Sequence, residues 1–259
     1  MRIIRYTDAA GNAARYGVLD GDEVRPIEGD IFGSFKAGGK AVPLSRVQQL
    51  PCATPTKVVA GGANYHGHLK EVGLPVPETP VFFLKPPTSV VGQDGQVVYW
   101  PETKQLEYEG ELAIVVKGRM HRTPPHRVLE NILGYTCVND VTARDIQVIG
   151  GNLLHLCESK SFDTFCPIGP WIETELDTRK LDLALTINGK VRQTTNTSDM
   201  IFPVEQMVSY FSHVMTLLPG DLILTGTPQG IGQMQVGDHV EVAIEGIGTL
   251  RHTVVAGGE

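Results

Sequence analysis

Three carboxylates in two segments of the chain, Glu109, Glu111 and Asp140, are the residues whose types could together bind a hard divalent cation. Oxygen ligands from two or three carboxylates, completed by water, suit magnesium, manganese or calcium. Neither a cysteine nor a paired-histidine motif lies beside them in the sequence, so zinc is a poor fit. The residue types therefore indicate a metal site of the magnesium class.

The segment Leu106–Val116 is expected to form a strand, in which alternate side chains share a face. Its three glutamates then point the same way, and the same face continues with Ala113 and Val115. Apolar residues on this face indicate that at least the inner two carboxylates are partly buried, and a buried carboxylate needs a cation, a proton or hydrogen bonds. A solvated acidic strand explains the alternation equally well. Both interpretations stay open at this point.

His68 and Glu71 are three residues apart, so on a helix they are neighbours and the carboxylate can orient the imidazole as a general base. We expect a short helix over Asn64–Glu71, after the strand Val58–Ala60 and a turn at Gly61–Gly62. A pair of this spacing is more often a surface ion pair. Its position after a glycine turn at a strand end favours the catalytic interpretation.

Two further segments could contact an anion. Lys160 lies among polar and aromatic residues, where it could neutralise a substrate carboxylate or enolate, although a solvated loop lysine is the ordinary alternative. The segment Thr225–Gly232 follows the apolar run Leu222–Leu224, and its glycines could let backbone amides approach an anion. It lacks the lysine of a phosphate-binding loop, so phosphate binding is only weakly indicated.

The composition excludes several classes of protein. A net charge of −7 disfavours phosphate-backbone binding, so we expect no nucleic-acid partner. The four cysteines lack CxxC spacing, which favours reduced thiols in the cytoplasm. Because no apolar run approaches membrane-spanning length, we expect a soluble protein without a membrane partner. The remaining histidines show no ligand spacing and receive no role: His121, His126, His155, His213, His239 and His252.

Short apolar runs bounded by glycine and proline predict many strands and few helices. The expected strands are Arg2–Tyr6, Tyr16–Leu19, Glu23–Ile27, Val81–Lys85, Gln96–Trp100, Leu106–Val116, Tyr135–Asn139 and Leu181–Ile187, with turns at Asp20-Gly21 and Asn188-Gly189. One helix is expected to begin at Pro203 and another to run from about Pro125 to Gly134. The first has a core stripe of Val204, Met207, Val208, Phe211 and Met215. The pattern indicates a mixed α+β, β-dominated roll or barrel.

Six motifs, in their order and spacing, resemble the fumarylacetoacetate hydrolase family over roughly Lys57 to Val254. They are Asn64-Tyr65-x-x-His68-x-x-Glu71, Phe83-Leu84-Lys85-Pro86, Tyr108-Glu109-Gly110-Glu111-Leu112, Asn139-Asp140-Val141-Thr142-Ala143-Arg144-Asp145, Lys160-Ser161-Phe162-Asp163 and Thr225-Gly226-Thr227-Pro228. Several ordered motifs are far more specific than any one of them alone.

This resemblance implies a β-roll or barrel catalytic domain over residues 56–259, a small N-terminal strand domain over residues 1–55, and a homodimer. It implies Mg²⁺ or Mn²⁺ bound by Glu109, Glu111 and Asp140. The catalytic residues would be His68, Glu71 and Lys160. Substrate-binding residues would be Tyr65, Lys85, Gln147, Thr225, Gly226 and Thr227.

The resemblance also implies a small-molecule 2-oxo acid substrate. We expect a metal-dependent hydrolase that cleaves a carbon-carbon bond in 2,4-diketo acids (acylpyruvates), releasing pyruvate and a carboxylic acid, with His68 as the base that activates water. The alternatives on the same scaffold are an oxaloacetate-type decarboxylase and an isomerase or tautomerase of unsaturated 2-oxo dicarboxylates. A non-catalytic binding protein is an alternative of another class, and metal-dependent thermal stabilisation would separate it from the enzymes.

The chain departs from the family pattern in two places. Glu158-Ser159 stands before the lysine where a basic and a small residue are expected, and the segment Ile149–His155 also differs. A negative side chain near the mouth of the site disfavours a dianionic substrate. We therefore expect an acylpyruvate of modest size as the substrate, in preference to a dicarboxylate.

Overall fold

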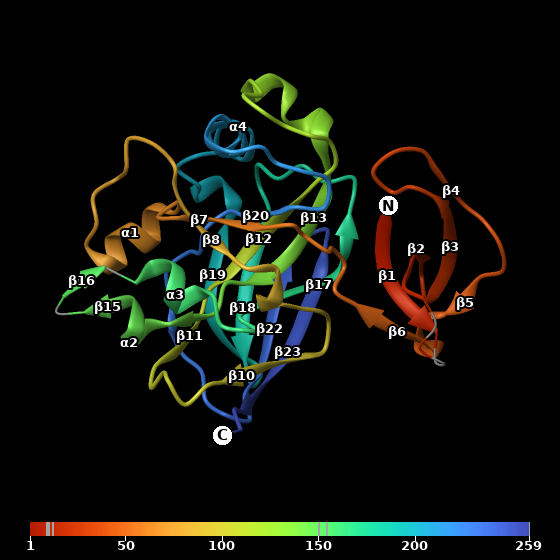
Figure 1. Ribbon diagram of the computed structural model, residues 1–259. Coiled ribbons are helices and arrows are strands. Elements are labelled where there is room, and N and C mark those ends of the chain that lie inside the picture. Colours follow the sequence, from red (N-terminus) through yellow and green to blue (C-terminus); the bar gives the residue numbers. More distant parts are fainter. Residues whose placement is uncertain (9–10, 12, 150, 154, 259) are drawn as a thin grey trace.

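The computed structural model describes residues 1–8, 11, 13–149, 151–153 and 155–258. Strands dominate it (Figure 1). They are β1 (Arg2–Asp8), β2 (Arg15–Asp20), β3 (Glu23–Gly29), β4 (Phe35–Ala37), β5 (Val42–Pro43), β6 (Val47–Leu50), β7 (Val58–Gly62), β8 (Val81–Lys85), β9 (Val90–Val91), β10 (Gly95–Tyr99), β11 (Leu106–Tyr108), β12 (Gly110–Val116), β13 (Ile132–Asn139), β14 (Thr142–Ala143), β15 (Val148–Ile149), β16 (Asn152–Leu153), β17 (Cys166–Glu173), β18 (Asp182–Ile187), β19 (Lys190–Asn196), β20 (Leu222–Leu224), β21 (Gly232–Gln233), β22 (His239–Ile244) and β23 (Gly248–Ala256). The α-helices are α1 (His66–Val72), α2 (Arg144–Gln147), α3 (Leu156–Lys160) and α4 (Val204–Val214).

The largest sheet has the strand order β4-β3-β2-β1-β17-β13-β12-β20-β7-β8. Strand β12 lies in its interior, antiparallel to both β13 and β20. The pair β20 and β7 is parallel, whereas β7 and β8 are antiparallel. In this order a single strand, β20, separates the strand with the glutamates from the strand that leads to α1.

A second sheet has the order β10-β23-β22-β18-β19, and a small sheet joins β14, β11 and β21. Among the described residues both large sheets are open paths of strands and do not close into a barrel. The mixed α+β, β-dominated class that the sequence predicts is confirmed.

Strand β12 is buried along its whole length, and its side chains divide between two apolar clusters. Leu112, Ile114 and Val116 pack toward strands of the second sheet. Ala113 and Val115 pack in the other cluster. The alternation inferred from the sequence is therefore confirmed, and it places Glu111 on the face of Ala113.

Helix α4 packs on the first of these clusters and confirms four of the five residues of the predicted core stripe. The fifth, Met215, is the C-cap residue and is only partly buried. Val204, Met207, Val208 and Phe211 are each exposed by 2% or less. The helix begins one residue later than predicted, because Pro203 is its N-cap residue and not its first helical residue.

The predicted helix from Pro125 to Gly134 is wrong. Two 3-10 turns, Pro125–Arg127 and Leu129–Asn131, occupy its place, and β13 begins at Ile132. Val128 is fully buried but Leu129 is 50% exposed, so the apolar spacing does not mark a continuous buried helix face. Ile132 instead pairs with Val116 in the sheet.

Two smaller expectations also differ from the structure. Gly61–Gly62 extends β7 and does not form a turn. The chain leaves the strand at Ala63, whose φ is 53°. The expected strand Leu106–Val116 is interrupted at Glu109, between β11 and β12.

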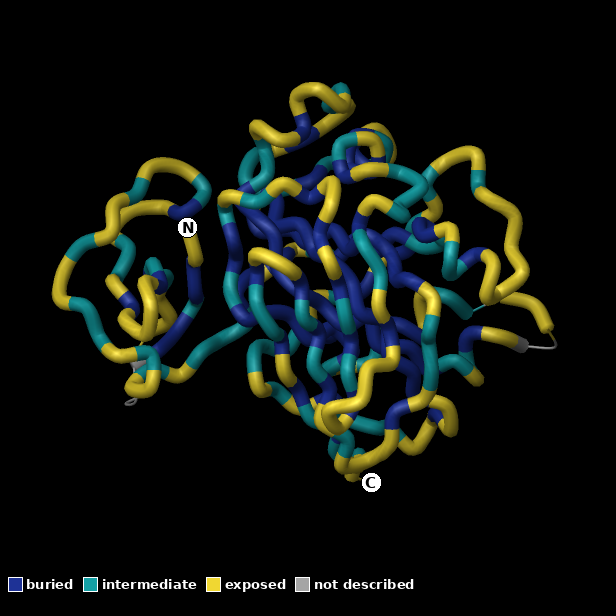
Figure 2. Tube along the Cα trace, turned by 180° about the vertical axis from the view of Figure 1, so that it is seen from behind, coloured by how far each residue is buried: buried dark blue, intermediate teal, exposed yellow. Residues whose placement is uncertain are grey.

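Strands β1 to β6 form a lobe beside the larger body (Figures 1 and 2). The lobe has its own small apolar cluster, which includes Ile4, Leu19 and Val24. Its strands belong to the largest sheet, and the lobe is connected to the larger body where Arg2 and Ile3 of β1 pair with β17. The division into domains at residue 55 stays a prediction. No helix in the described chain has the length and apolar character needed to cross a membrane.

Candidate metal centre and active site

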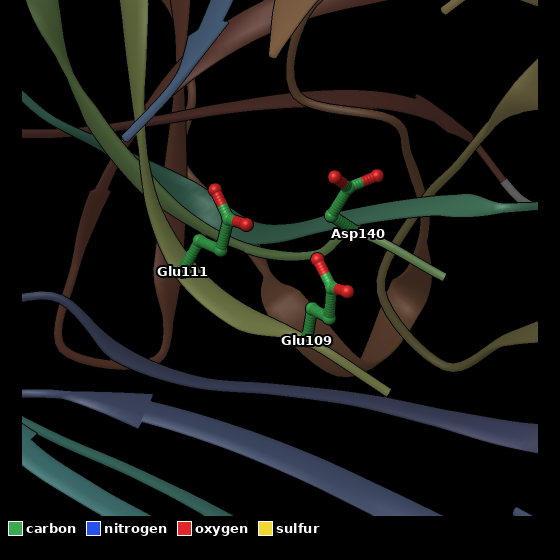
Figure 3. A group of neighbouring side chains, drawn as sticks. All are labelled: Glu109, Glu111 and Asp140. Carbon is green, nitrogen blue, oxygen red and sulfur yellow. The ribbon is translucent and has the colours of Figure 1, made fainter. Parts of the chain in front are cut away.

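The three predicted ligands come together in the structure. Glu109, Glu111 and Asp140 each offer one carboxylate oxygen, and these oxygens lie within 4.8 Å of one another. Figure 3 shows the three carboxylates converging on one space. Their exposure is 6%, 1% and 1% respectively. The interpretation as a solvated acidic strand is therefore wrong.

Pairing of β12 with β13 brings the two acidic segments together, because Gly110 lies opposite Asn139. The backbone N–H of Asp140 donates to the carbonyl of Glu109 at 2.8 Å. In return, the backbone N–H of Glu109 donates to the Asn139 side-chain oxygen at 2.8 Å. Backbone contacts thus fix the spacing of two of the carboxylates before any cation binds.

Three buried or partly buried cations surround the carboxylates. Lys160 lies 2.6 Å from a Glu109 oxygen and 2.8 Å from an Asp140 oxygen. Lys85 lies 2.5 Å from the other Asp140 oxygen. Arg144 donates to Glu109 at 2.5 Å and, from a different nitrogen, to Glu107 at 2.7 Å. Among the described residues, Glu111 is the one carboxylate of this group without a cationic side chain at ion-pair distance.

The pKa values of Glu109, just before β12, and of Glu111, in β12, are shifted in opposite directions. Burial alone would raise the pKa of Glu109, but the Lys160 and Arg144 cations outweigh it and lower that pKa to about 2. Burial, followed by repulsion from Asp140 and Glu109, raises the pKa of Glu111 well above its usual value. The cluster is thus short of positive charge beside Glu111. An all-oxygen donor set that lacks positive charge at its centre fits a hard divalent cation such as Mg²⁺ or Mn²⁺.

The predicted acid-base pair lies on α1. His68 Nδ1 is 3.4 Å from one oxygen of Glu71, and the side chains are 14% and 33% exposed. The other oxygen of Glu71 accepts the backbone N–H of Gly230 at 3.0 Å. His68 lines the same cavity as Glu109 and Glu111, so the pair is not simply a surface ion pair.

The loop after β20 is built onto β12. The N–H of Gly226 donates to Glu111 at 2.7 Å, and Gly226 has a φ of 93° that suits glycine. The Thr225 hydroxyl donates to the carbonyl of Leu112. The anion that this loop contacts is therefore the protein's own glutamate. Thr227 and Ile231 are the loop residues that line the cavity.

Gln193 of β19 connects the loop to the carboxylates, which the sequence reasoning missed. Its side-chain oxygen accepts the N–H of Gly110, the residue between the two glutamates, at 2.9 Å. Its amide nitrogen donates to the Thr227 hydroxyl and to the Pro228 carbonyl, both at 2.9 Å. Gln193 is 1% exposed. One buried amide thus fixes the loop relative to the ligand strand.

His252 of β23, which received no role from its sequence, lies behind the centre. Its Nε2 is 2.9 Å from the side-chain nitrogen of Asn139. Since the Asn139 oxygen already accepts the N–H of Glu109, the nitrogen must donate to His252. Burial lowers the pKa of His252 to about 3. A neutral histidine therefore connects the second sheet to the metal centre.

Glu109, Glu111 and His68 open into one cavity of 580 Å³. Six predicted site residues line it: His68, Glu109, Glu111, Gln147, Lys160 and Thr227. Asp140 and Lys85 lie behind the lining, joined to each other. Tyr65, Thr225 and Gly226 are buried but do not line the cavity, and the Tyr65 hydroxyl makes no hydrogen bond among the described residues.

The segment that departs from the family pattern forms part of the rim. β15 and β16 make a hairpin, and Gly150 and Leu154 of this segment lie outside the described residues. Glu158 is 2.5 Å from His155, and both side chains are exposed. Glu158 therefore faces an exposed imidazole and is not among the described residues that line the cavity.

Some missed residues carried a signal in the sequence and others did not. Arg144 and Asn139 stood inside a recognised motif. His252 alternates with the buried Leu250 and Val254, and a histidine on an inward face indicates a hydrogen-bond role. Gln193 offered no comparable signal, because its partners are distant in the sequence.

Comparison with known proteins finds one family model over most of the chain. The model named fumarylacetoacetate (FAA) hydrolase C-terminal matches residues 57–255, and a model named Rv2993c-like, N-terminal, matches residues 1–51. The solved structure of 2-hydroxyhepta-2,4-diene-1,7-dioate isomerase from Mycobacterium marinum has a TM-score of 0.90 and 40% identity, with 100% of both chains covered.

Two further relatives have other named activities. A mitochondrial oxaloacetate tautomerase from Bos taurus is 37% identical over 225 residues, which cover 83% of this chain and 71% of the tautomerase. The solved structure of maleylpyruvate hydrolase from Sphingobium sp. SYK-6 has a TM-score of 0.80 and 29% identity, covering 99% of this chain and 100% of that one. Hydrolysis, tautomerisation and isomerisation all occur among these names.

Proposed function

Since the chain belongs to the fumarylacetoacetate hydrolase family, we propose that it is an enzyme that hydrolyses a carbon-carbon bond in 2,4-diketo acids. The products would be pyruvate and a carboxylic acid. The observation that carries this proposal is that two groups meet at one cavity: Glu109 and Glu111, with Asp140 just behind them, and His68, with Glu71 beside it. The first group suits a chelating 2-oxo acid, and the second suits activation of water.

We propose that the cofactor is Mg²⁺ or Mn²⁺, bound by Glu109, Glu111 and Asp140. When bound, the ion would supply Lewis-acid stabilisation of the negative charge that develops on the substrate's 2-oxo oxygen. The lack of positive charge beside Glu111 supports this assignment, because the bound ion would supply the missing charge.

His68 would act as the general base. Its Nε2 would accept a proton from water, while Glu71 beside Nδ1 would hold the orientation of the ring. The water oxygen then bonds to the distal carbonyl carbon, C4. When the bond between C3 and C4 breaks, its electron pair stays on C3, and the pyruvate enolate that leaves takes up a proton.

Residues beside the carboxylates would hold the other end of the substrate. Lys160, which is 2% exposed and faces Glu109 and Asp140, would balance the negative charge of the enolate. Gln147 would donate to the oxo group, and Arg144 orients its amide by donating to the Gln147 oxygen at 2.5 Å. Thr227 would contact the substrate carboxylate from the opposite loop.

A keto-enol tautomerase or an isomerase is the second candidate, favoured by the names of the Bos taurus and Mycobacterium marinum relatives. Such a reaction needs only proton transfer at C3. His68 could supply it without an attacking water. An oxaloacetate-type decarboxylase would use the same groups.

The test measures pyruvate released from acetylpyruvate and, separately, from oxaloacetate, with Mg²⁺ or Mn²⁺ and after chelation. Metal-dependent cleavage of acetylpyruvate, lost in Glu109→Gln and in His68→Ala, would support the hydrolase. Oxaloacetate tautomerisation, followed by absorbance of the enol, without cleavage of acetylpyruvate would move the assignment to the tautomerase. If metal raises neither turnover nor thermal stability, the proposed centre is wrong.

We also propose a homodimer in the cytoplasm, in keeping with the family resemblance. Light scattering coupled to size-exclusion chromatography would give the mass of the particle in solution. A mass near that of one chain would contradict the dimer.

A further inference from the structure

The outer part of the cavity is apolar, in contrast to the carboxylate end. It is lined by Val72, Leu74, Pro75, Pro77, Val81 and Ile231. Val72, Leu74 and Val81 are 40%, 54% and 41% exposed. Clusters of exposed apolar side chains are uncommon unless they bind something. These residues line the same cavity as Glu109 and Glu111, so a ligand that reaches the carboxylates can contact them as well.

The hairpin on the other side of the mouth continues this apolar lining. Val148 and Leu153 both line the cavity, and they are 40% and 56% exposed. Leu156, at the start of α3, adds a third apolar side chain. The outer part of the cavity therefore has hydrocarbon on two sides.

Positive charge in the described lining is confined to the inner end. The basic residues of the lining are His68, Arg144 and Lys160. Arg144 and Lys160 are already paired with carboxylates. A second carboxylate on the far end of a substrate would meet Val81 and Leu74 with no described cation to pair with, and an unpaired carboxylate on apolar surface loses hydration.

The charge of the inner end leads to the same conclusion. Four carboxylates (Glu107, Glu109, Glu111 and Asp140) face three cations (Lys85, Arg144 and Lys160) among the described residues. A bound divalent ion changes the balance from one negative charge to one positive charge. The single carboxylate of a 2-oxo acid neutralises it, and a second one would leave the site with excess negative charge.

We propose that the acyl group distal to the 2-oxo acid is an uncharged hydrocarbon chain, long enough to reach Leu74 and Val81. This inference rests on the proposed function and names its substrate class. The substrates are acylpyruvates with aliphatic acyl groups, not 2-oxo dicarboxylates. The reaction that supplies such a substrate must join a hydrocarbon acyl group to C3 of pyruvate, or open a ring to give one.

The first test compares two substrates of equal shape. In 4-methylpentanoylpyruvate two methyl groups take the place of the two distal oxygens of succinylpyruvate. We expect kcat/KM for the hydrocarbon substrate to exceed that for the acid by about 10²-fold, the discrimination that an apolar pocket supplies. Equal values, or a preference for succinylpyruvate, would overturn the inference.

The second test measures binding without turnover. Oxamates carry the carboxylate and the neighbouring carbonyl of a 2-oxo acid but lack its C3–C4 bond. Titration calorimetry with N-(3-methylbutyl)oxamate and N-(2-carboxyethyl)oxamate, on protein loaded with Mn²⁺, should show tighter binding of the first by about 10-fold or more. Tighter binding of the acid would contradict the inference independently of any activity.

The third test reverses the preference. Val81→Lys places a cation in the apolar wall, so succinylpyruvate should gain and 4-methylpentanoylpyruvate should lose in kcat/KM. The matched control is Val236→Lys, because Val236 is 54% exposed and does not line the cavity. An unchanged ratio in Val81→Lys, in a variant whose melting temperature is also unchanged, would count against the position of the acyl group.

Failure of the inference can be told apart from failure of the proposed function. If neither diketo acid is cleaved but the hydrocarbon oxamate still binds more tightly, the hydrolase is wrong and the apolar subsite stands. If both are cleaved at equal rates, the hydrolase stands and the subsite is wrong.

Discussion

The inner and outer ends of the cavity differ in the chemistry of their side chains and in the elements that carry them. The inner end holds carboxylates that are at most 6% exposed, on and beside β12 and β13 in the interior of the largest sheet. The outer end holds Leu74 and Leu153, more than half exposed, on the connection after α1 and on the short hairpin. Strands hold reacting groups in a fixed geometry, whereas surface connections tolerate exchange of side chains. The proposed reaction and the proposed choice of acyl group would thus depend on separate parts of the chain.

The largest effect should come from the inner end. Glu111→Gln removes the carboxylate that has no cationic partner, so we expect kcat/KM for acetylpyruvate to fall by about 10³-fold, since Lewis-acid stabilisation is worth several kcal/mol. The rise in melting temperature on adding Mn²⁺ should also disappear. Without metal the variant should be no less stable than the native chain, because the change relieves repulsion from Glu109 and Asp140.

The control for this change is Glu158→Gln, since Glu158 is an exposed carboxylate paired only with His155 among the described residues. It should keep both activity and the metal-induced shift in melting temperature. If Glu158→Gln loses the metal-induced shift in melting temperature, or if Glu111→Gln keeps it, the buried carboxylates do not differ from a surface carboxylate in metal binding.

The next largest effect should come from Gln193, which connects the segment of the two glutamates to the loop after β20. Gln193→Ala leaves the Gly110 N–H without its acceptor and frees Thr227. We expect a loss of about 2 kcal/mol in the free energy of unfolding and a fall of about 10²-fold in kcat/KM, because small displacements of positioned groups are costly. Chemical denaturation and steady-state kinetics measure the two effects.

Exposed Gln206 on α4 gives the control Gln206→Ala, which should change neither quantity. A purely structural role for Gln193 would lower the stability and leave kcat/KM of the folded fraction unaltered. That result would show that the position of the loop does not affect the reacting groups at the carboxylates.

A smaller effect is expected at the outer end. Val81→Ala shortens the apolar wall, so kcat/KM for 4-methylpentanoylpyruvate should fall by about 10-fold, within the range for lost hydrocarbon contact in a pocket. Acetylpyruvate, whose methyl group does not reach the wall, should be cleaved as before. Equal losses for both substrates would mean that Val81 supports the inner end, against the separation described above.

The smallest effect on turnover should come from behind the centre. The pKa of His252 is about 3 in the folded protein and near 6.5 in an unfolded chain. Between these values the unfolded chain binds the extra proton, so the free energy of unfolding falls as the pH is lowered from about 6.5 toward 3, by at most about 1.4 kcal/mol per pH unit.

In His252→Gln this part of the pH dependence should be absent, while kcat at pH 7.5 should change little, because glutamine can still accept a hydrogen bond from Asn139. Urea denaturation at several pH values measures it. His126→Gln, at an exposed histidine, should keep the native slope. A native slope in His252→Gln would show that this ring is not neutral and buried in solution.

The sequence predicted the inner end better than the outer one, and the reason is physical. Strand alternation, which is a local property of the chain, put Glu111 on the face of Ala113 and so indicated that this carboxylate is partly buried. The turn at Asn188-Gly189 is confirmed, because Ile187 pairs with Lys190 across it. The first hairpin turns one residue later than predicted, at Gly21-Asp22, because Asp20 pairs with Glu23. By contrast, the grouping of Leu74 with Leu153 depends on how a loop after α1 meets a hairpin far along the chain.

The wrong helix at Pro125 to Gly134 has a related cause. A helical spacing of apolar residues is a weak constraint over so short a segment, and pairing of Ile132 with β12 overrides it. Gln193 was missed for the same reason. Its partners Gly110, Thr227 and Pro228 are distant in the sequence, and only the packing of β19 against the loop after β20 brings Gln193 to them. The motifs identified the reacting groups, but not the hydrogen bonds that hold them.

Glu71 has one further consequence. One of its oxygens lies beside His68 and the other accepts the N–H of Gly230, in the loop that also carries Thr227. A displacement of Gly230 would therefore shift the Glu71 carboxylate, and with it the orientation of the His68 ring. The position of the imidazole is thus coupled to the loop that carries Thr227 through a single carboxylate group.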